Sequence, residues 1–194
     1  MKKSYIFLAE GFEEVEALTV VDIMRRAGMN VATVSIYDTP VVTGAHGIGV
    51  QTDCLFTDVQ DFNDADWLIF PGGMPGAVNL RQFEPLMNVL EAHAADGGNI
   101  AAICAAPAVV LADMGLLKGK EATCYPGFDG VLKENKAIYR DSPAIVDGNI
   151  VTGNGPASAM RFALTIVQQA CGNEKSQEVG AGLLFYPKQI NFYF

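Results

Sequence analysis

Short apolar runs with the composition of β-strands alternate along this chain with longer segments of helical periodicity. Ser4–Ala9 is predicted to be a buried strand, the segment from about Glu13 to Ala27 a helix, and Val31–Ile36 a second strand. Within the helix, apolar residues recur at helical spacing and form one inward stripe. This strand–helix–strand pattern predicts a parallel pair of strands joined by a right-handed crossover.

The same alternation continues through the rest of the chain. Trp67–Phe70 and Asn99–Ile103 are predicted core strands, and Asp147-Gly148-Asn149 indicates a hairpin turn. The pattern predicts one α/β domain over residues 1–184, with a mainly parallel sheet and helices on both faces. The other expected elements are a hairpin or irregular excursion over Pro40–Thr52, a helix from about Pro85 to Ala95, a strand at Glu121–Cys124, hairpin strands at Ala144–Val146 and Ile150–Thr152, and a helix over Ala157–Cys171.

Composition and charge narrow the class of protein. Half of the 194 residues are hydrophobic and the formal net charge is −9, so the chain can bury one core and disfavours a polyanionic partner. The apolar run Tyr5–Ala9 stops at Glu10, which is unlike a secretion signal, and no apolar run is long enough to span a bilayer. We therefore expect a soluble cytoplasmic protein that binds neither nucleic acid nor membrane.

The cysteines are widely spaced and form no C-x-x-C pair, and the chain has two histidines, His46 and His93. This pattern predicts reduced thiols without disulfides, no zinc site, and no other metal or cofactor. Apart from Cys104, the thiols are expected to be structural, with one of them near Tyr125; they are Cys54, Cys124 and Cys171.

Three segments that follow predicted strands have compositions suited to chemistry. They are Glu10–Glu16, Pro71–Gly73 and Cys104–Pro107. In open α/β sheets, functional sites form beyond the carboxyl ends of the strands. We therefore expect any reactive groups of this chain to come from these three segments.

Cys104 directly follows a predicted strand and precedes Ala105-Ala106-Pro107, where proline suits the first turn of a helix. A thiol at the positive end of a helix can have its pKa lowered from about 8.5 to roughly 3.5–7.5, which would make it a nucleophile. The same residues are also typical of a small, inert cysteine buried in an apolar run. Spacing alone leaves both interpretations open.

Gly72 and Gly73 can turn tightly after a strand and bring a backbone N–H close to a ligand oxygen. Paired with the amide of Ala105, the amide of Gly73 can form an oxyanion hole. An ordinary turn at the end of a strand explains the two glycines equally well.

Glu13, Glu14 and Glu16 crowd the first turn of the predicted helix, where the helix dipole favours acidic residues. A carboxylic acid held neutral beside a thiolate can donate a hydrogen bond to it or move protons. The helical pattern does not choose among the three.

Five motifs occur in a fixed order along the chain. They are A-E-G-F-E-E-V-E-A (Ala9–Ala17), D-I-M-R-R-A-G (Asp22–Gly28), F-P-G-G (Phe70–Gly73), A-A-I-C-A-A-P (Ala101–Pro107) and G-N-G-P (Gly153–Pro156). Together they resemble the ThiJ/PfpI superfamily, and look most like the branch of the parkinsonism-associated protein DJ-one and its bacterial relatives. The resemblance covers about residues 2–180. It implies a flavodoxin-like α/β sandwich and a homodimer with the site near the subunit interface.

The resemblance also implies roles for individual residues. It places the nucleophile on Cys104, the acid on Glu16 as the third glutamate of E-E-x-E, and the oxyanion donors on the backbones of Gly73 and Ala105. No metal or nucleotide is implied. The activities it implies are glutathione-independent conversion of methylglyoxal to lactate (glyoxalase III), protein deglycation, chaperone activity and peroxide sensing through cysteine sulfinate. A stress sensor or chaperone-like protein without turnover is the alternative to an enzyme.

Two positions depart from parts of the superfamily. Tyr125 stands where many relatives have a histidine, and Ala105 stands where the protease-like branch has one, so we expect neither a Cys–His dyad nor proteolysis. Together with Gly72, Tyr125 is a candidate for the substrate pocket. His46 falls in a region that reaches the partner's site in relatives, so it is either a further pocket residue or a solvated loop histidine, whereas His93 is expected to be an unremarkable residue of a surface helix.

The last residues, 185–194, form an unusually aromatic tail that ends in Phe192-Tyr193-Phe194. Such a tail can dock on its own domain or on a second subunit, or it can form an exposed site for another partner. The sequence does not choose among these.

Overall fold

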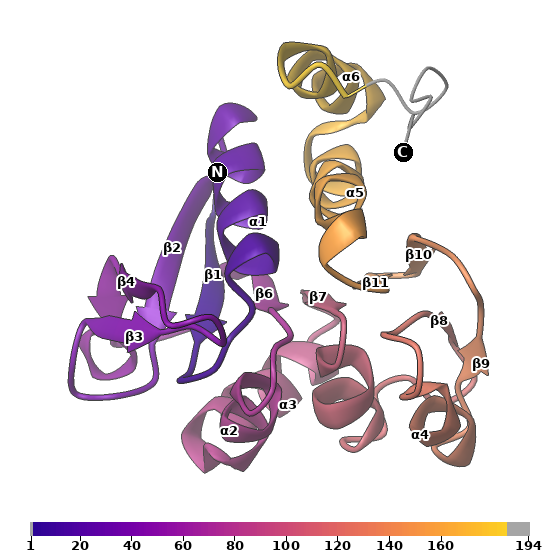
Figure 1. The fold of residues 1–194 in the computed structure, drawn as a ribbon, viewed down its shortest axis with the longest axis horizontal. Helices are drawn as coiled ribbons and strands as arrows, with labels where there is room; N and C mark the ends of the chain where they lie inside the picture. The colour runs from indigo at the N-terminus through magenta and orange to yellow at the C-terminus, as the bar shows by residue number, and fades with distance from the viewer. Residues whose placement is uncertain (1, 186–194) are drawn as a thin grey trace.

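A seven-stranded sheet forms the centre of the molecule in the computed structural model, which describes residues 2–185 (Figure 1). The strand order is β10-β11-β7-β6-β1-β2-β5, and within this sheet only the β10–β11 pair is antiparallel. This confirms the expected mainly parallel sheet. Its strands are β1 (Lys3–Leu8), β2 (Asn30–Ser35), β5 (Cys54–Leu55), β6 (Ala65–Phe70), β7 (Asn99–Ile103), β10 (Ala144–Asp147) and β11 (Ile150–Gly153).

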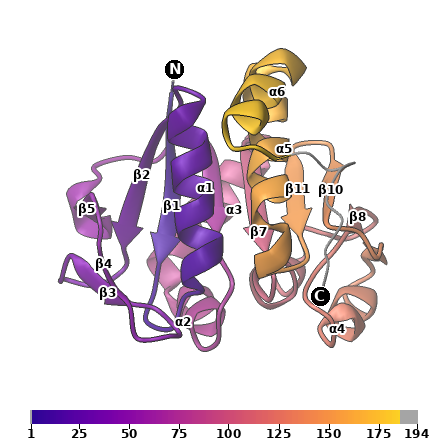
Figure 2. The same ribbon diagram turned by 45° about the horizontal axis from the view of Figure 1, so that its top comes forward.

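Helices cover both faces of the sheet. In Figure 2, α1 and α5 lie in front of the strands and α3 behind them, and α6 packs on α5. The opposite face is covered by α2, α3 and a π-helical segment, η2, against which α4 packs. The helical elements are α1 (Glu14–Arg26), α2 (Gly76–Gln82), α3 (Glu84–Ala95), η2 (Pro107–Ala112), α4 (Asp129–Glu134), α5 (Ala159–Cys171) and α6 (Asn173–Gly182), with short 3-10 turns η1 (Phe56–Asp58) and η3 (Pro156–Ser158). No helix of residues 2–185 is long and apolar enough to cross a membrane.

The sequence of β1 explains why the sheet is covered on both sides. Alternate side chains of a strand point to opposite faces. Tyr5 and Phe7 lie in the core cluster beneath α2 and α3, whereas Ile6 and Leu8 lie in the cluster beneath α1 and α5. Since both sets are apolar and buried, this strand has to sit in the middle of a two-sided sandwich.

Helix α1 matches the prediction closely. The Glu13 carboxylate accepts a hydrogen bond from the backbone N–H of Glu16 at 2.7 Å and so caps the helix. The predicted apolar stripe is buried, and Gly28, with φ of +77°, follows the C-terminus in a conformation that favours glycine. The cap holds the first turn of the helix in place, and that turn carries Glu16.

Two predicted segments form small separate sheets. Pro40–Thr52 contains the antiparallel hairpin β3 (Val41–Thr43) and β4 (Gly49–Gln51). The predicted strand Glu121–Cys124 is shorter, because only β8 (Glu121–Ala122) pairs, and it pairs with β9 (Ile138–Tyr139) rather than with the main sheet.

Three helices have no counterpart in the sequence prediction: α2, α4 and α6. They are short or largely polar; α6 reads N-E-K-S-Q-E-V-G-A-G and buries only Val179 and Gly180. A helix without a strong apolar stripe gives little periodic signal. Of the aromatic tail, only Phe185 is described; it lies close to the guanidinium of Arg161, and the rest of that prediction lies outside the described residues.

Candidate active site

Cys104 stands at the carboxyl end of β7 in a left-handed backbone conformation, with φ of +66°. Its N–H donates to the carbonyl of Gly153 at 2.9 Å, and its carbonyl accepts from the N–H of Tyr125 at 2.8 Å. This conformation costs a non-glycine residue about 1–3 kcal/mol and persists only where its surroundings impose it. Cys104 therefore lies in a sharp turn, which two long-range hydrogen bonds hold.

Glu16 projects from the first turn of α1 towards Cys104 and is fully buried. Its Oε2 accepts a hydrogen bond from the N–H of Gly72 at 2.8 Å. Its Oε1 has no nitrogen or oxygen donor among residues 2–185, and the Cys104 thiol interacts with this carboxyl. Of the three glutamates in the first turn, Glu16 is thus the one that faces the sulfur.

The closeness of the thiol and the carboxyl depends on Gly72. A Cβ atom added to Gly72 would lie 2.5 Å from Cys104 Cβ, 2.7 Å from Glu16 Oε2 and 3.0 Å from Cys104 Sγ. Real Cβ atoms do not approach other atoms so closely, so the space between the two side chains admits only glycine. Gly73 is restricted too, because its φ is +88° and a Cβ there would meet the backbone of Gly11.

Two backbone amides from different loops converge on the sulfur. The N–H of Gly73 and the N–H of Ala105 both donate towards Cys104 Sγ. Gly73 follows β6 and Ala105 follows β7, and these neighbouring parallel strands end at the same edge of the sheet. Such paired donors can stabilise negative charge on sulfur or on an oxygen bonded next to it.

The pKa values of the pair are shifted by burial and by each other. Burial raises the pKa of Glu16 to about 7. Burial and the neighbouring Glu16 carboxylate raise the pKa of the Cys104 thiol to about 12, against the opposing effect of the two amides. Of the two interpretations that the spacing leaves open for Cys104, a thiol with a lowered pKa is not the one that this arrangement favours, because burial and the Glu16 carboxylate outweigh the amide donors. Between these two pKa values the pair holds a single proton, which lies on the thiol.

Tyr125 lies at the rim of this site. Its side chain is 45% exposed, and its ring lies beside Gly155, where an added Cβ would be 3.2 Å from Tyr125 Cδ2. The backbone bond between Tyr125 and Cys104 ties this rim to the turn that carries the thiol. A pocket role for Tyr125 stays a prediction.

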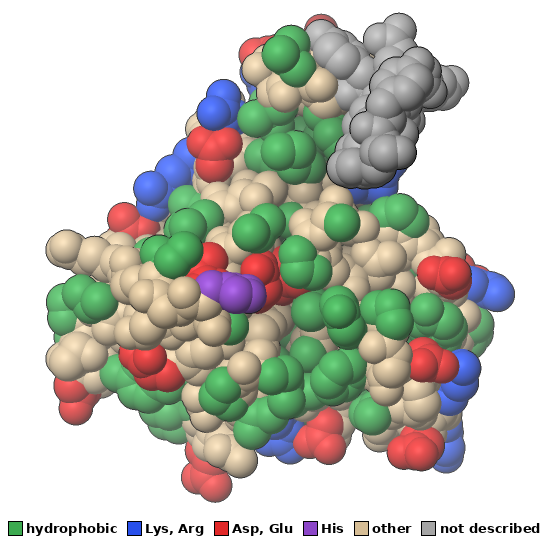
Figure 3. Space-filling model, viewed as in Figure 1, with side chains coloured by type: hydrophobic (Ala, Val, Ile, Leu, Met, Phe, Trp, Pro, Cys, Tyr) green, Lys and Arg blue, Asp and Glu red, His purple; other side chains and the backbone are tan. Residues whose placement is uncertain are grey.

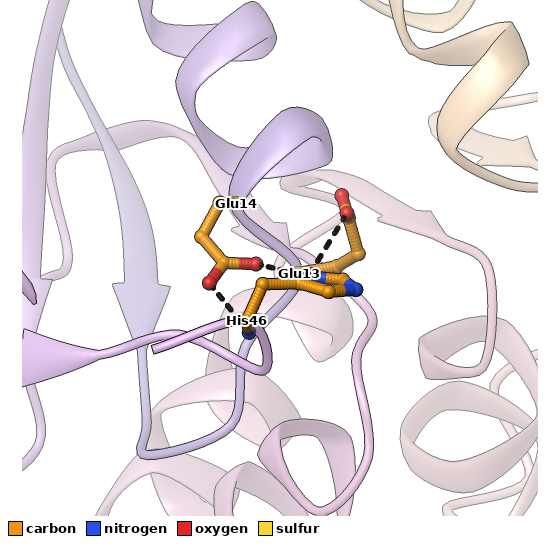
Figure 4. Close-up of side chains that lie close together, drawn as sticks. All are labelled: Glu13, Glu14 and His46. Carbon is orange, nitrogen blue, oxygen red and sulfur yellow. Dashed lines mark hydrogen bonds and ion pairs between the residues drawn. The ribbon is translucent and has the colours of Figure 1, made fainter. Parts of the chain in front are cut away.

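His46 is a solvent-exposed loop histidine, with 69% of its side chain exposed, and it is paired with Glu14 (Figure 4). It lies in the turn between β3 and β4, its backbone N–H donates to Glu14 Oε1 at 2.7 Å, and its Nδ1 lies 2.8 Å from Glu14 Oε2. No local pattern in the sequence indicates this pair, because its members are 32 positions apart.

The other histidine lies at the opposite end of β7 from Cys104. His93 is buried, contrary to expectation, and its Nε2 lies 3.0 Å from the carbonyl of Asn99, at the start of β7 and far from Cys104. All four cysteines are free thiols, and Cys124 is fully buried.

Comparison with known proteins gives a consistent result. The model of the DJ-1/PfpI family matches residues 2–169. Protein DJ-1 homolog B from Arabidopsis thaliana is 39% identical over 192 residues, covering 99% of this chain and 43% of that protein. Glutathione-independent glyoxalase DJR-1.2 from Caenorhabditis elegans is 31% identical over 170 residues, covering 88% of this chain and 89% of that protein.

A solved structure, "Toxoplasma gondii DJ-1, oxidized", matches with a TM-score of 0.89 at 36% sequence identity and covers 95% of this chain and 99% of that chain. Lengths differ among the relatives. The chain spans less than half of the two Arabidopsis proteins, 43% of homolog B and 47% of homolog A.

Proposed function

The chain belongs to the DJ-1/PfpI family, and on this basis we propose that it is a cysteine-dependent, cofactor-free enzyme that converts α-oxoaldehydes such as methylglyoxal to α-hydroxy acids. The family and the flavodoxin-like α/β fold expected from the sequence are confirmed. The observation that carries the proposal is the convergence of the Glu16 carboxyl and the Gly73 and Ala105 amides on the Cys104 thiol. A relative named as a glutathione-independent glyoxalase supports it.

In the first step, Cys104 Sγ attacks the aldehyde carbon and a C–S bond forms. The thiol proton passes to the Glu16 carboxylate, which is the general base. The aldehyde oxygen becomes an oxyanion, stabilised by the amides of Gly73 and Ala105, and protonation gives a hemithioacetal. A thiol with a high resting pKa suits this step, because the base removes its proton as the bond forms.

In the second step, Glu16 removes the hydrogen of the former aldehyde carbon as a proton, which leaves an enediolate. The adjacent carbon and its oxygen each gain a proton, and the hydroxyl of the former aldehyde carbon loses its proton to become the thioester carbonyl. The product is a thioester of the α-hydroxy acid on Cys104. Water then cleaves the C–S bond, which releases lactate when methylglyoxal is the substrate and regenerates the thiol. The sum of the steps adds one water to methylglyoxal and needs no oxidant or reductant.

The test is lactate formation from methylglyoxal, without glutathione, by the wild type and three variants. Cys104→Ser should lose about 10³-fold or more of the activity, and Glu16→Gln about 10²–10⁴-fold. Cys171→Ser, which changes the same group at the far end of α5, is the matched control and should retain full activity. Absence of lactate with the wild type at millimolar substrate, or equal rates in all four proteins, would contradict the proposal.

A second candidate function is peroxide sensing through the same thiol, and one finding favours it: the similar Toxoplasma structure is described as oxidized. One thiol and two molecules of hydrogen peroxide give a sulfinic acid and two molecules of water. The Gly73 and Ala105 amides and a protonated Glu16 offer three donors to sulfinate oxygens.

Intact-protein mass spectrometry after mild peroxide treatment distinguishes the two functions. Addition of two oxygen atoms at Cys104 alone, in a protein without aldehyde turnover, favours the sensor. Oxidation spread evenly over all four thiols counts against it.

A further inference from the structure

Three side chains of types that can ligate a metal meet at the start of α1. Glu13 and Glu14 come from the start of α1, and His46 comes from the turn between β3 and β4 (Figure 4). Glu14 Oε2 lies 2.8 Å and Glu13 Oε1 4.0 Å from His46 Nδ1. The three atoms lie within 4.8 Å of one another.

Each carboxylate is held by a backbone amide through one oxygen and offers the other to the imidazole. Glu13 Oε2 accepts from the N–H of Glu16, and Glu14 Oε1 accepts from the N–H of His46, both at 2.7 Å. The Glu13 side chain is only 10% exposed, yet its Oε1 accepts no hydrogen bond from any described residue and faces His46. Ligands fixed in this way by neighbouring hydrogen bonds are typical of metal sites.

The charge of the cluster also favours a cation. Glu13 and Glu14 are both buried, and within residues 2–185 neither forms an ion pair with a lysine or an arginine. Buried carboxylates are costly unless a positive charge or a metal compensates them. Figure 3 shows acidic side chains beside a histidine in the middle of this face, with hydrophobic side chains around them and the basic side chains towards its edges.

We propose that Glu13 Oε1, Glu14 Oε2 and His46 Nδ1 bind a divalent transition-metal ion of the zinc class, with water completing the coordination. Zinc binds imidazole nitrogen and carboxylate oxygen at 2.0–2.2 Å, so tetrahedral ligand atoms are about 3.4 Å apart. The present separations from Nδ1, 2.8 and 4.0 Å, lie on either side of that value, and each has to change by about 0.6 Å to reach it. The nitrogen ligand favours zinc over calcium or magnesium, which prefer oxygen.

The proposed metal ligands are not among the groups to which the aldehyde chemistry is assigned, although Glu13 accepts a hydrogen bond from the N–H of Glu16. The imidazole loses its Nδ1 proton to solvent when the metal binds. From the sequence we expected no zinc site, because the chain lacks cysteine pairs and has only two histidines. A site made of two carboxylates and a histidine 32 positions away in the sequence has none of the short ligand spacings by which zinc sites are recognised in a sequence.

The experiment titrates Zn²⁺ into the full chain carrying Cys104→Ser, which removes the thiol of the candidate active site as a competing ligand. Isothermal calorimetry should give one bound equivalent, and X-ray absorption at the zinc edge should show nitrogen and oxygen neighbours without sulfur. His46→Asn and Glu14→Gln, added separately, should each weaken binding at least about tenfold. Glu84→Gln removes an acid from the first turn of another helix, α3, and should leave binding unchanged.

Three results would overturn the proposal: no zinc bound at millimolar concentration, sulfur in the coordination sphere, or unchanged affinity in His46→Asn. Because His46 is exposed, its variant keeps the test valid even if the buried Glu14 variant folds poorly. Circular dichroism of each variant checks the fold.

Discussion

Glu16 and Cys104 compete for one proton in a buried space, and this competition governs how the site should respond to pH. Glu16 must be ionised to accept the thiol proton, and burial raises its pKa to about 7. The thiol keeps its proton up to a pKa of about 12 because it is buried beside that carboxylate. The reactive form is therefore the form of the pair that holds a single proton.

The rate of aldehyde turnover should fall as the pH drops below about 7, because Glu16 gains a proton and loses its role as a base. A decline on the alkaline side is expected only towards pH 12, the pKa of the thiol. The measurement is kcat/KM against pH in chelator-treated protein, with alkylation of Cys104 as a second readout. The fall in kcat/KM below about pH 7 should be absent in Glu16→Gln. If that fall persists in the variant, another group causes it.

The raised pKa of Glu16 also makes a prediction about stability. A carboxyl whose folded pKa lies above its unfolded value of 4.5 contributes stability below that value and loses the contribution as the pH rises through about 7. Glu16→Gln keeps an acceptor for the N–H of Gly72 but cannot ionise. Its melting temperature, compared with the wild type by calorimetry, should therefore be relatively higher at pH 8 than at pH 5. If the difference in melting temperature between Glu16→Gln and the wild type does not change with pH, the charged form of Glu16 does not destabilise the protein.

The turn between β6 and α2 brings the side chains of Glu16 and Cys104 together. Gly72 donates its N–H to Glu16 and leaves no room for a side chain beside Cys104, and Gly73 contributes one of the two amides. The turn thus sets the position of the base relative to the nucleophile.

Gly72→Ala should destabilise the protein by about 1–3 kcal/mol and lower activity by more than its loss of folded protein explains. The physical reason is the 2.5 Å approach of the new Cβ to Cys104 Cβ. Gly130→Ala in α4, where an added Cβ meets nothing within 4 Å, is the matched control and should be neutral or stabilising. Chemical denaturation and methylglyoxal turnover measure the two effects. A fully active Gly72→Ala protein would contradict the assigned geometry.

The elements that the sequence predicts well are those whose own residues carry the signal. The buried runs of β1, β6 and β7 and the apolar stripe of α1 are local patterns, and the structure has them within about two residues of the prediction. The order of the motifs and the family resemblance assign four residues to one candidate site. In the structure these residues are neighbours: Cys104, Glu16, Gly73 and Ala105. The direction of the Cys104 pKa shift and the contact between Glu14 and His46 depend on which groups meet across the fold, and local patterns do not contain that information.

For the whole molecule, the expected homodimer stays a prediction, and the surface suggests where to test it. Val15 and Leu18 of α1 are 54% and 41% exposed, and Met160 of the neighbouring α5 is 43% exposed. Neighbouring exposed apolar side chains favour burial against another surface.

Sedimentation equilibrium should show a dimer for the wild type and a monomer for Val15→Glu combined with Leu18→Glu, because charges would be buried at the interface. Ile138→Glu changes a residue of similar exposure, 45%, in β9 and should leave the dimer intact. A monomeric wild type, or a dimer unaffected by the double change, would rule out an interface through α1.

The hydrogen bond from the Cys104 N–H to the Gly153 carbonyl also determines when, during synthesis of the chain, the turn at Cys104 can form. A ribosome adds residues from the N-terminus, so the strand that carries Gly153 is made well after the cysteine. Until β11 joins β7, nothing on that side holds the cysteine in its strained conformation. The growing chain therefore carries the side chains of Glu16 and Cys104 before it can hold them in the arrangement of the folded protein, and that arrangement forms only when β11 has joined the sheet.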